Sequence, residues 1–242
     1  MNRVVIKASE VAAVIGRNPY KSATEVRDEM WKRYWPETFR GETRGERSWK
    51  AVRSSGNATK VLDEAVAIQT KSSTETENVF LNAKASIEAD QTLTTVEKAD
   101  VIDHIRSKVY TNHGIRSEDK TSDALEGVFK KDNAFHMFHV CDIENYDFTI
   151  VGKIDRIQEM PDGSKVLIEI KNRTKRLFNK IPEYEYVQVQ TYLQMLNLER
   201  GRLVEQYNDT IASHDVVRDD EYWKSVLVAL ESFCRELIER VE

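Results

Sequence analysis

The sequence predicts an α+β protein with an α/β-type core, in which a mixed β-sheet is flanked by helices and carries a helical N-terminal elaboration. Three observations predict this class. Spaced apolar residues typical of amphipathic helices dominate the first 110 residues, β-branched and aromatic residues gather between 135 and 171, and the last 58 residues alternate helix, strand and helix patterns. A chain of 242 residues with 40% hydrophobic content is long enough for one large domain or two small ones.

The N-terminal region is predicted to be mainly helical. Ser9 is a candidate N-cap for a short helix, the sequence GRNPY breaks it, and a second helix starts near Ser22. Residues 39–48 are polar and contain glycine, which predicts a loop. Residues 49–110 are predicted as helices with polar interruptions, and four spaced apolar residues suit one buried face: Val61, Leu62, Ala65 and Ile68.

Strand patterns follow a helical stretch, residues 113–131, that holds Glu118 in an early turn. Residues 135–140, 147–160 and 165–171 are rich in strand-forming residues, and the PDG at 161–163 is a turn signal. The pattern predicts a hairpin with Asp155 on one strand and Glu169 and Lys171 on the next. The remaining elements are a helix over 185–201 ended by Gly201, a strand over 202–208 and a closing amphipathic helix over 219–242.

Composition excludes several classes of protein. The chain has no apolar run long enough to span a membrane and no secretory signal pattern at its start, so we expect an intracellular protein with no membrane partner. Cys141 and Cys234 lie far apart and match no CxxC pattern, which predicts packing residues in a reducing compartment. The HMFH sequence would suggest a metal pair, His136 and His139, only in a helix; in a strand it predicts packing.

Charged residues inside the apolar run VLIEIK indicate a site. Glu169 and Lys171 share one strand face, about 6.6 Å apart along the strand at about 3.3 Å per residue, while Val166, Ile168 and Ile170 take the other face. With Asp155 from the neighbouring strand, two carboxylates and an ammonium group converge. Magnesium prefers such oxygen ligands, and the Ile170 carbonyl could supply a third. The lysine would orient or deprotonate water, and its charge state stays open.

A basic window follows this site. The overall net charge of −5 argues against general affinity for nucleic acid, but residues 171–180 hold five cations and no acid: Lys171, Arg173, Lys175, Arg176 and Lys180. A solvated surface with chance clustering is the structural alternative. The position beside the charged pair favours contact with a nucleic-acid backbone.

Five short elements together resemble a known family. They are ASEVAAVIGRNPYKS, HGIRSE, GKIDRI with Asp155, IEIK with Glu169 and Lys171, and YVQVQTY. The sequence resembles the PD-(D/E)XK nucleases, within the branch of phage lambda exonuclease, YqaJ-type viral recombinases and RecB-type nuclease domains. The resemblance implies a single nuclease domain over residues 1–242 with a restriction-endonuclease-like fold. Residues from about 30 to 110 would be its helical elaboration and residues from about 111 to 242 its catalytic core. Ile154 departs from the family's proline, and residues 30–110 have no recognised counterpart.

The resemblance assigns further residues. It implies metal binding by Glu118, four residues after Gly114, and a contact with DNA-end phosphate by Ser9. The motif on the later helix fits Gln188 with Tyr192 or Gln188 with Gln190, and one glutamine would orient the lysine or the scissile phosphate. Arg3 lies near an arginine position of lambda-like enzymes without matching its register. The predicted DNA contacts are Ser9, Arg173, Lys175, Arg176 and Tyr192.

Structural alternatives accompany these assignments. Asp155, Glu169 and Lys171 could form a cross-strand ion pair, Glu118 could serve the helix dipole, and Ser9 could simply cap a helix, which is compatible with phosphate binding. Gln188, Gln190 and Tyr192 could form structural hydrogen bonds, since 188 and 192 share a helix face.

The expected function is a magnesium-dependent exonuclease acting 5′ to 3′ on double-stranded DNA ends. The resemblance implies two Mg²⁺ ions during catalysis, replaceable by Mn²⁺, a 5′-phosphate product, and a viral or phage origin with action in the cytoplasm or nucleus of a host cell. It also implies recombination, repair or genome processing beside a single-strand annealing protein. Oligomeric state stays open, a homo-oligomer included. The alternatives are a structure- or sequence-directed endonuclease and an inactive DNA-end binding module.

Overall fold

Two mixed β-sheets form the centre of the computed structural model, which describes residues 1–178 and 180–241. The strands are β1 (Asn2–Lys7), β2 (Phe129–Lys131), β3 (His136–Ile143), β4 (Tyr146–Gly152), β5 (Arg156–Glu159), β6 (Lys165–Asn172), β7 (Arg200–Tyr207) and β8 (Thr210–Val217). The helices are the 3₁₀ turn η1 (Ala8–Glu10), α1 (Val11–Val14), α2 (Ala23–Tyr34), α3 (Arg44–Ser54), α4 (Gly56–Ala67), α5 (Ser73–Glu88), α6 (Thr95–Asp123), α7 (Glu183–Leu196) and α8 (Asp220–Val241).

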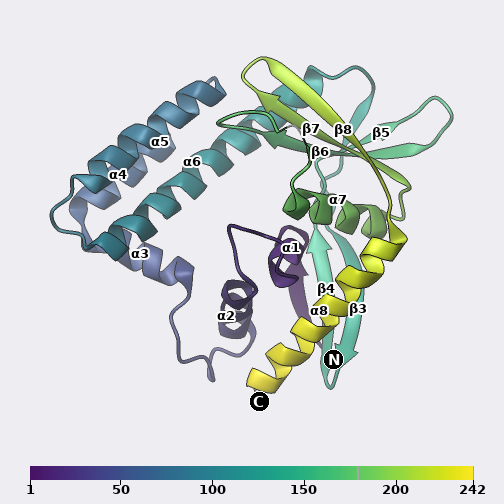
Figure 1. The fold of residues 1–242 in the computed structure, drawn as a ribbon, viewed down its shortest axis with the longest axis horizontal. Coiled ribbons are helices and arrows are strands. Elements are labelled where there is room, and N and C mark those ends of the chain that lie inside the picture. The colour runs from purple at the N-terminus through teal and green to yellow at the C-terminus, as the bar shows by residue number, and fades with distance from the viewer. Residues whose placement is uncertain (179, 242) are drawn as a thin grey trace.

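The predicted mixed sheet is present in two parts. The smaller sheet has the order β1-β4-β3, with β1 parallel and β3 antiparallel to β4. The larger sheet has the order β2-β5-β6-β7-β8, with a parallel β6–β7 pair among antiparallel neighbours. Figure 1 shows α7 lying between the two sheets and α8 crossing beside β3 and β4. The α+β class is therefore confirmed.

Alternating side chains of β6 serve two hydrophobic clusters. Leu167 packs in the main core with residues of β1, β4, α7 and α8. Ile168 and its neighbours on the same face pack with Leu125 and Phe129, which follow α6. Because both faces are covered, the strand is almost continuously apolar, as expected for a central strand beside a parallel neighbour. The predicted separation of Glu169 from the Ile168 face is confirmed.

A helical arm, defined as residues 44–110, has a cluster of its own. Its core contains Val52, Leu62, Phe80 and Ile105, none of which belongs to the main cluster. In Figure 1, α3, α4 and α5 lie alongside the first half of α6 and apart from β3, β4 and α8. The second half of α6 runs on to the larger sheet, where it contacts β6. The N-terminal 34 residues pack in the main core instead.

Helix boundaries in the N-terminal half correct two predictions. Ser9 is no N-cap, because it lies inside η1, where Lys7 is the N-cap and has no side-chain capping bond. Residues 44–48 are helical, because Thr43 and Glu46 form a reciprocal capping box that starts α3 within the predicted loop. The predicted start near Ser22 is confirmed by its capping box with Glu25.

The C-terminal half also differs from prediction in detail. The run 147–160 forms two strands of different sheets, β4 and β5, separated by residues 153–155. The helix predicted over 185–201 ends at Leu196, because Asn197 adopts the left-handed conformation (φ 51°) that terminates helices, and Gly201 lies in β7. The closing helix is α8, and Glu242 lies outside the described residues.

Two sequence exclusions can be compared with the structure. Within residues 1–178 and 180–241, no helix combines the length and the apolar character needed to cross a membrane. Cys141 and Cys234 are free thiols, and Cys234 is buried in the main core. The prediction that the cysteines serve packing is confirmed for Cys234.

Candidate active site

The β5–β6 hairpin positions the predicted charged residues. A turn at Asp162 and Gly163, with Gly163 at φ 80°, joins the two strands, and Met160 and Ser164 close it with a backbone hydrogen bond of 2.9 Å. Asp155 lies directly before β5, while Glu169 and Lys171 lie near the end of β6. The three residues, named the inner cluster below, therefore meet at the end of the hairpin that is opposite to its turn.

The Asp155 side chain bonds β6 at the point where the backbone pairing between β5 and β6 has ended. Paired residues of β5 and β6 end with Arg156 opposite Ile168, and beyond them the Asp155 Oδ2 accepts a 2.7 Å hydrogen bond from the Ile170 backbone N–H. In an extended strand, the N–H and C=O of one residue point toward the same edge. The Ile170 carbonyl therefore faces the Asp155 side of β6, as a metal-binding role for it requires.

Lys171 is held between two oxygen atoms. Its Nζ donates to the Glu169 Oε1 at 2.8 Å and to the Gln188 Oε1 at 2.9 Å. Gln188 in turn donates from its Nε2 to the Tyr192 hydroxyl at 3.4 Å, one turn further along α7. The Tyr192 ring packs so closely on Gly152 that a Cβ there would lie 2.6 Å from the ring. This series of contacts, from Gly152 through Tyr192 and Gln188 to Lys171, fixes the direction in which the ammonium group points.

Burial, and for two of them the charge of Asp155, shifts the pKa values of the carboxyl groups upward. Burial, followed by the charge of Asp155, raises the pKa of Glu169 to about 7. Burial also raises the pKa of Asp155, and burial followed by the charge of Asp155 raises the pKa of Glu118. For Lys171, burial alone would lower the pKa, but Glu169, Glu185 and Asp155 together raise it. Lys171 is therefore an ammonium group beside carboxylates that resist ionisation.

These residues fit a divalent cation. The Glu169 Oε2 is buried and has no hydrogen-bond partner among the described residues, and a buried carboxylate oxygen without a partner is energetically costly. Asp155 lies close enough to Glu118 for its charge to raise the pKa of Glu118. A hard cation bound by these oxygens would pair with the Glu169 oxygen and reduce the repulsion between the carboxylates. Carboxylates with a backbone carbonyl are the ligands that Mg²⁺ takes.

A family model of the PD-(D/E)XK nuclease superfamily matches residues 12–239. The chain belongs to this superfamily. Among solved structures, similar folds are the alkaline exonuclease LHK-Exo of Laribacter hongkongensis (13% identity, TM-score 0.43, 80% of this chain and 93% of that one) and a phage-related exonuclease of Haemophilus somnus 129PT (13%, 0.41, 75% and 94%). The structure of SSO0001 has 18% identity and a TM-score of 0.43 over 74% and 83% of the two chains. No curated protein matches significantly.

Membership of the nuclease superfamily agrees with the resemblance found in the sequence motifs. The individual site residues stay predictions, and the structure determines which of them can act together.

Glu118 reaches this site from a position that the sequence did not suggest. It lies near the C-terminal end of α6, which begins at Thr95, rather than in an early turn. The helix dipole disfavours a carboxylate there, so the dipole does not explain Glu118. Its nearness to Asp155 is the observation that supports the predicted metal role.

Two predicted residues form contacts away from the inner cluster. The Gln190 Nε2 donates to the Val217 carbonyl at 2.8 Å and its Oε1 accepts from the Asp219 N–H at 2.9 Å, so Gln190 joins α7 to the segment before α8. The expectation that Gln190 orients the lysine is therefore wrong, because residues two apart on a helix face different directions; Gln188 has that contact instead.

Arg173 is also not a free cation. Its guanidinium forms two hydrogen bonds to Glu185, at 2.5 and 2.6 Å, and one of 2.8 Å to Glu205. The ring of Phe178 covers it at 4.2 Å. The prediction that Arg173 binds DNA phosphate is corrected, because two buried carboxylates neutralise its charge.

The other predicted DNA contacts differ in accessibility. Tyr192 is 4% exposed, so it orients Gln188 and does not reach a DNA backbone, contrary to prediction. Ser9, Lys175 and Arg176 are exposed and remain available for phosphate contact. Ser9 follows Ala8, which packs on Gly152 beside Tyr192, so its predicted role stays open.

Sequence reasoning missed Arg156 and Glu185. Arg156 is 4% exposed; its Nη1 donates to the Asp155 carbonyl at 2.7 Å and its Nη2 pairs with Asp119, the neighbour of Glu118. Arg156 thus ties α6 to the loop that carries Asp155. Glu185 raises the pKa of Lys171 and holds Arg173. Its place three residues before Gln188, on the same face of a helix, was the available signal.

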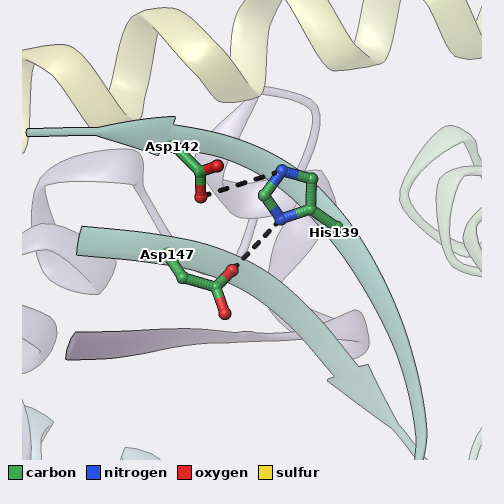
Figure 2. Close-up of side chains that lie close together, drawn as sticks. All are labelled: His139, Asp142 and Asp147. Atoms are coloured by element: carbon green, nitrogen blue, oxygen red, sulfur yellow. Dashed lines mark hydrogen bonds and ion pairs between the residues drawn. The ribbon is translucent and has the colours of Figure 1, made fainter. Parts of the chain in front are cut away.

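A second set of metal-ligand types lies away from this site. His139 and Asp142 of β3 and Asp147 of β4 have ligand atoms within 4.8 Å of one another (Figure 2). We name them the outer cluster. The His139 Nδ1 lies 3.1 Å from Asp147, while Arg3 and Thr149 also bond that carboxylate. Arg3 thus lies at the outer cluster, and this place does not support its comparison with the arginine of lambda-like enzymes.

Proposed function

We propose that this protein is a metal-dependent deoxyribonuclease that removes nucleotides from double-stranded DNA ends in the 5′ to 3′ direction. The observation that carries the proposal is the inner cluster, in which Lys171 is oriented by Glu169 and Gln188 while a buried Glu169 oxygen has no hydrogen-bond partner among the residues that the structure describes. A buried carboxylate oxygen without a hydrogen bond is unusual in an ion pair with a purely structural role.

The metal ligands in this proposal are Asp155, Glu169, Glu118 and the Ile170 carbonyl. Mg²⁺, with Mn²⁺ as its substitute, would be the ion, and two ions could bind during catalysis. The bound cation would supply Lewis-acid stabilisation of the charge that develops on the phosphate. Arg156 serves as a positioning residue, because it holds the Asp155 backbone and the Asp119 side chain together.

The contribution of Lys171 follows from its charge. As an ammonium group it has no lone pair to accept a proton, so it acts by donating hydrogen bonds to the attacking water or to a phosphate oxygen. Two of its three N–H bonds are directed at Glu169 and Gln188, which leaves one for the substrate. Water attacks phosphorus, the bond to the 3′ oxygen of the leaving nucleoside breaks, and the products carry a 5′ phosphate and a 3′ hydroxyl.

Polarity and preference for ends are supported by the sequence resemblance to the lambda and YqaJ branch. Ser9 is exposed beside Ala8, which packs against Gly152, so phosphate at a DNA end could be held near the site. Lys175 and Arg176 provide exposed cations after β6. The same resemblance supports a place in recombination, repair or genome processing of viral or phage type beside a single-strand annealing protein.

The experiment is a time course on 5′-phosphorylated linear duplex DNA, labelled separately at the 5′ and 3′ ends, in magnesium or EDTA. We expect mononucleotides to appear first from the 5′ label, only with magnesium, and Lys171→Ala to abolish their release. Closed circular DNA is the matched substrate without ends. Internal cuts in it would favour an endonuclease, and binding without any cleavage would favour an inactive end-binding module.

A further inference from the structure

A cleft of about 770 Å³ lies between the helical arm and the core. One wall consists of residues of α3 and α6, including Arg44, Arg106 and Tyr110. The other wall includes Tyr20, Tyr184 and the segment from Asn172 to Phe178, apart from Leu177. Asn172 directly follows Lys171 on β6, so the cleft begins within about 3–7 Å of the lysine along the strand.

The charge of the cleft is opposite to that of the chain. Six basic and three acidic side chains line it, whereas the whole chain has a net charge of −5. Arg173 is one of the six, but its charge is neutralised by Glu185 and Glu205. Arg44 is paired with Glu25 and Asp103, so it shapes the wall more than it attracts a ligand. Arg176 has no acidic partner within ion-pair distance in the described part of the chain, and Lys175 is 63% exposed beside Glu77. Arg176 and Lys175 are therefore available to bind phosphate.

Aromatic rings lie beside these cations. Tyr20 is 66% exposed and packs edge-to-face on Tyr184, with ring centroids 5.5 Å apart. Phe178 lies between the guanidinium groups of Arg173, at 4.2 Å, and Arg176, at 6.0 Å. Because Tyr20 is 66% exposed, part of its ring surface is available to stack on a base. Cations that follow a backbone and rings that stack bases are together the means by which proteins bind single strands.

We propose that this cleft binds single-stranded DNA adjoining the point of cleavage, with the helical arm as the second wall; the inference rests on the proposed nuclease function. The volume of the cleft, about 770 Å³, lies within the range of about 300–1,000 Å³ for sites of drug-sized ligands. It is large enough for a few nucleotides and too small for a duplex. Duplex bases are also stacked on one another and offer no free faces to Tyr20 along their length.

Polar contacts hold the two walls together. The Arg44 Nη1 donates to the Tyr20 carbonyl at 3.3 Å from the arm side. Glu77 of α5 accepts from the Tyr110 hydroxyl and pairs with Lys175 at 3.6 Å. At the far side of the arm, the Asn208 N–H donates to the Ser73 hydroxyl at 3.1 Å. The arm thereby fixes both Tyr20 and the basic segment after β6 in position to line one cleft.

The test is fluorescence anisotropy with a 3′-fluorescein oligodeoxynucleotide of about 12 nucleotides, within the site sizes of ~4–16 known for single-strand binders. EDTA prevents cleavage during the titration, and a blunt duplex of the same sequence is the second probe. The variants are Tyr20→Ala, Tyr20→Phe, Arg176→Ala and Arg106→Ala. Lys60→Ala is the matched control, because Lys60 is an exposed cation of the arm that does not line the cleft.

We expect Tyr20→Ala and Arg176→Ala each to weaken single-strand binding about tenfold, while Tyr20→Phe and Lys60→Ala stay within about twofold of the wild type. Arg106→Ala should weaken binding about threefold, since Asp103 already pairs with it. The logarithmic salt dependence should fall by about 0.7 for Arg176→Ala. Wild-type binding by Tyr20→Ala and Arg176→Ala, or equal losses for the blunt duplex, would overturn the proposal.

Cleavage assays separate this inference from the proposed function. If Lys171→Ala binds the single strand normally and the wild type cleaves no DNA, the nuclease proposal fails and the cleft remains a binding site. If all cleft variants bind single strands like the wild type while the wild type cleaves linear DNA, the cleft proposal fails alone. Circular dichroism of each variant shows whether a loss of single-strand binding reflects misfolding. Tyr20→Phe keeps the aromatic ring, so normal binding by this variant together with weak binding by Tyr20→Ala assigns the loss to the ring.

Discussion

The two ends of β4 lie near clusters of the same ligand types in opposite environments. At its start, Asp147 belongs to the outer cluster. Gly152, at its end, lies about 17 Å from Asp147 along the strand, and the chain continues from Gly152 to Asp155 of the inner cluster. Hydrogen bonds from Thr149, with His139 and Arg3, lower the pKa of Asp147. Burial raises the pKa of Asp155.

The difference shows why proximity of ligand atoms is a poor guide to a metal centre. The outer cluster is the tighter of the two, but His139 lies beside both of its aspartates (Figure 2). Arg3 also pairs with Asp147. The inner cluster keeps a buried Glu169 oxygen that has no hydrogen-bond partner within residues 1–178 and 180–241. A cation adds most where negative charge is concentrated and uncompensated, so the inner cluster is the expected centre.

The largest expected effect comes from the inner cluster itself. Glu169→Gln and Lys171→Ala should each lower kcat for linear duplex DNA by at least about 10³-fold, because each removes a group placed to act on developing charge. Initial rates under single-turnover conditions measure it. Asp147→Asn is the matched change in the outer cluster and should stay within about twofold. A comparable loss for Asp147→Asn would invert the comparison.

A smaller effect is expected from the residue that orients Lys171. Gln188→Ala should lower kcat about 10- to 100-fold with little change in KM, as for residues that orient a ligand. Gln190→Ala is its control on the same helix, since Gln190 bonds Val217 and Asp219. It should lower thermal stability while the folded enzyme keeps its rate. Equal rate losses for both would contradict the assignment of Gln188 to the lysine.

The clusters should respond to pH in opposite directions. The pKa of Glu169 is about 7 in the folded metal-free protein against an ordinary 4.5, so its contribution to stability is full below 4.5 and is lost as pH rises through 7. The lowered pKa of Asp147 acts in reverse, and its contribution is lost as pH falls below 3.8. Thermal unfolding in EDTA from pH 4 to 8 measures the first effect, which Glu169→Gln should remove.

Magnesium should oppose the loss of stability at higher pH. Metal ions bind ionised carboxylates, so the rise in Tm produced by magnesium should grow as pH increases. Thermal unfolding of the wild type at pH 5.5 and 8, with and without magnesium, measures this rise. Glu169→Gln should reduce it at both values, whereas Asp142→Asn should leave it unchanged. A magnesium effect independent of pH would count against binding at Glu169.

The smallest expected effect is on the exposed outer cluster. Asp142 lies 3.9 Å from the His139 Nε2, and both side chains are more than half exposed. Asp142→Asn should change the free energy of unfolding by no more than about 0.5 kcal/mol, as for most surface substitutions. Urea denaturation at pH 7 measures it. A loss of several kcal/mol would show that the outer cluster is a structural site.

The sequence predicted the hairpin and its face pattern well because strand alternation is a local property. Glu169 and Lys171 needed only period-two alternation and one PDG turn to be placed at the site. Asp155 was predicted on the neighbouring strand, but it lies directly before β5. The position of Glu118 was not predictable from a local window, because α6 passes without a break from the arm to the core. A 29-residue helix contains no signal that marks where its two packing environments meet.

The neutralised cations were the other failure of local reasoning. Arg173 belongs to an uninterrupted basic window in the sequence, but its partners Glu185 and Glu205 come from α7 and β7. Likewise, the cleft draws its walls from residues as distant as Tyr20 and Arg176. Charge balance at one point in space depends on tertiary contacts, which a window of sequence does not contain.

The central claim is that the inner cluster binds the catalytic metal, and a Mn²⁺ titration followed by electron paramagnetic resonance tests it most directly. The titration compares the wild type, Glu169→Gln and Asp147→Asn without DNA at pH 8. We predict that Glu169→Gln loses at least tenfold in Mn²⁺ affinity, while Asp147→Asn binds like the wild type. Binding that survives Glu169→Gln and disappears in Asp147→Asn would contradict the account.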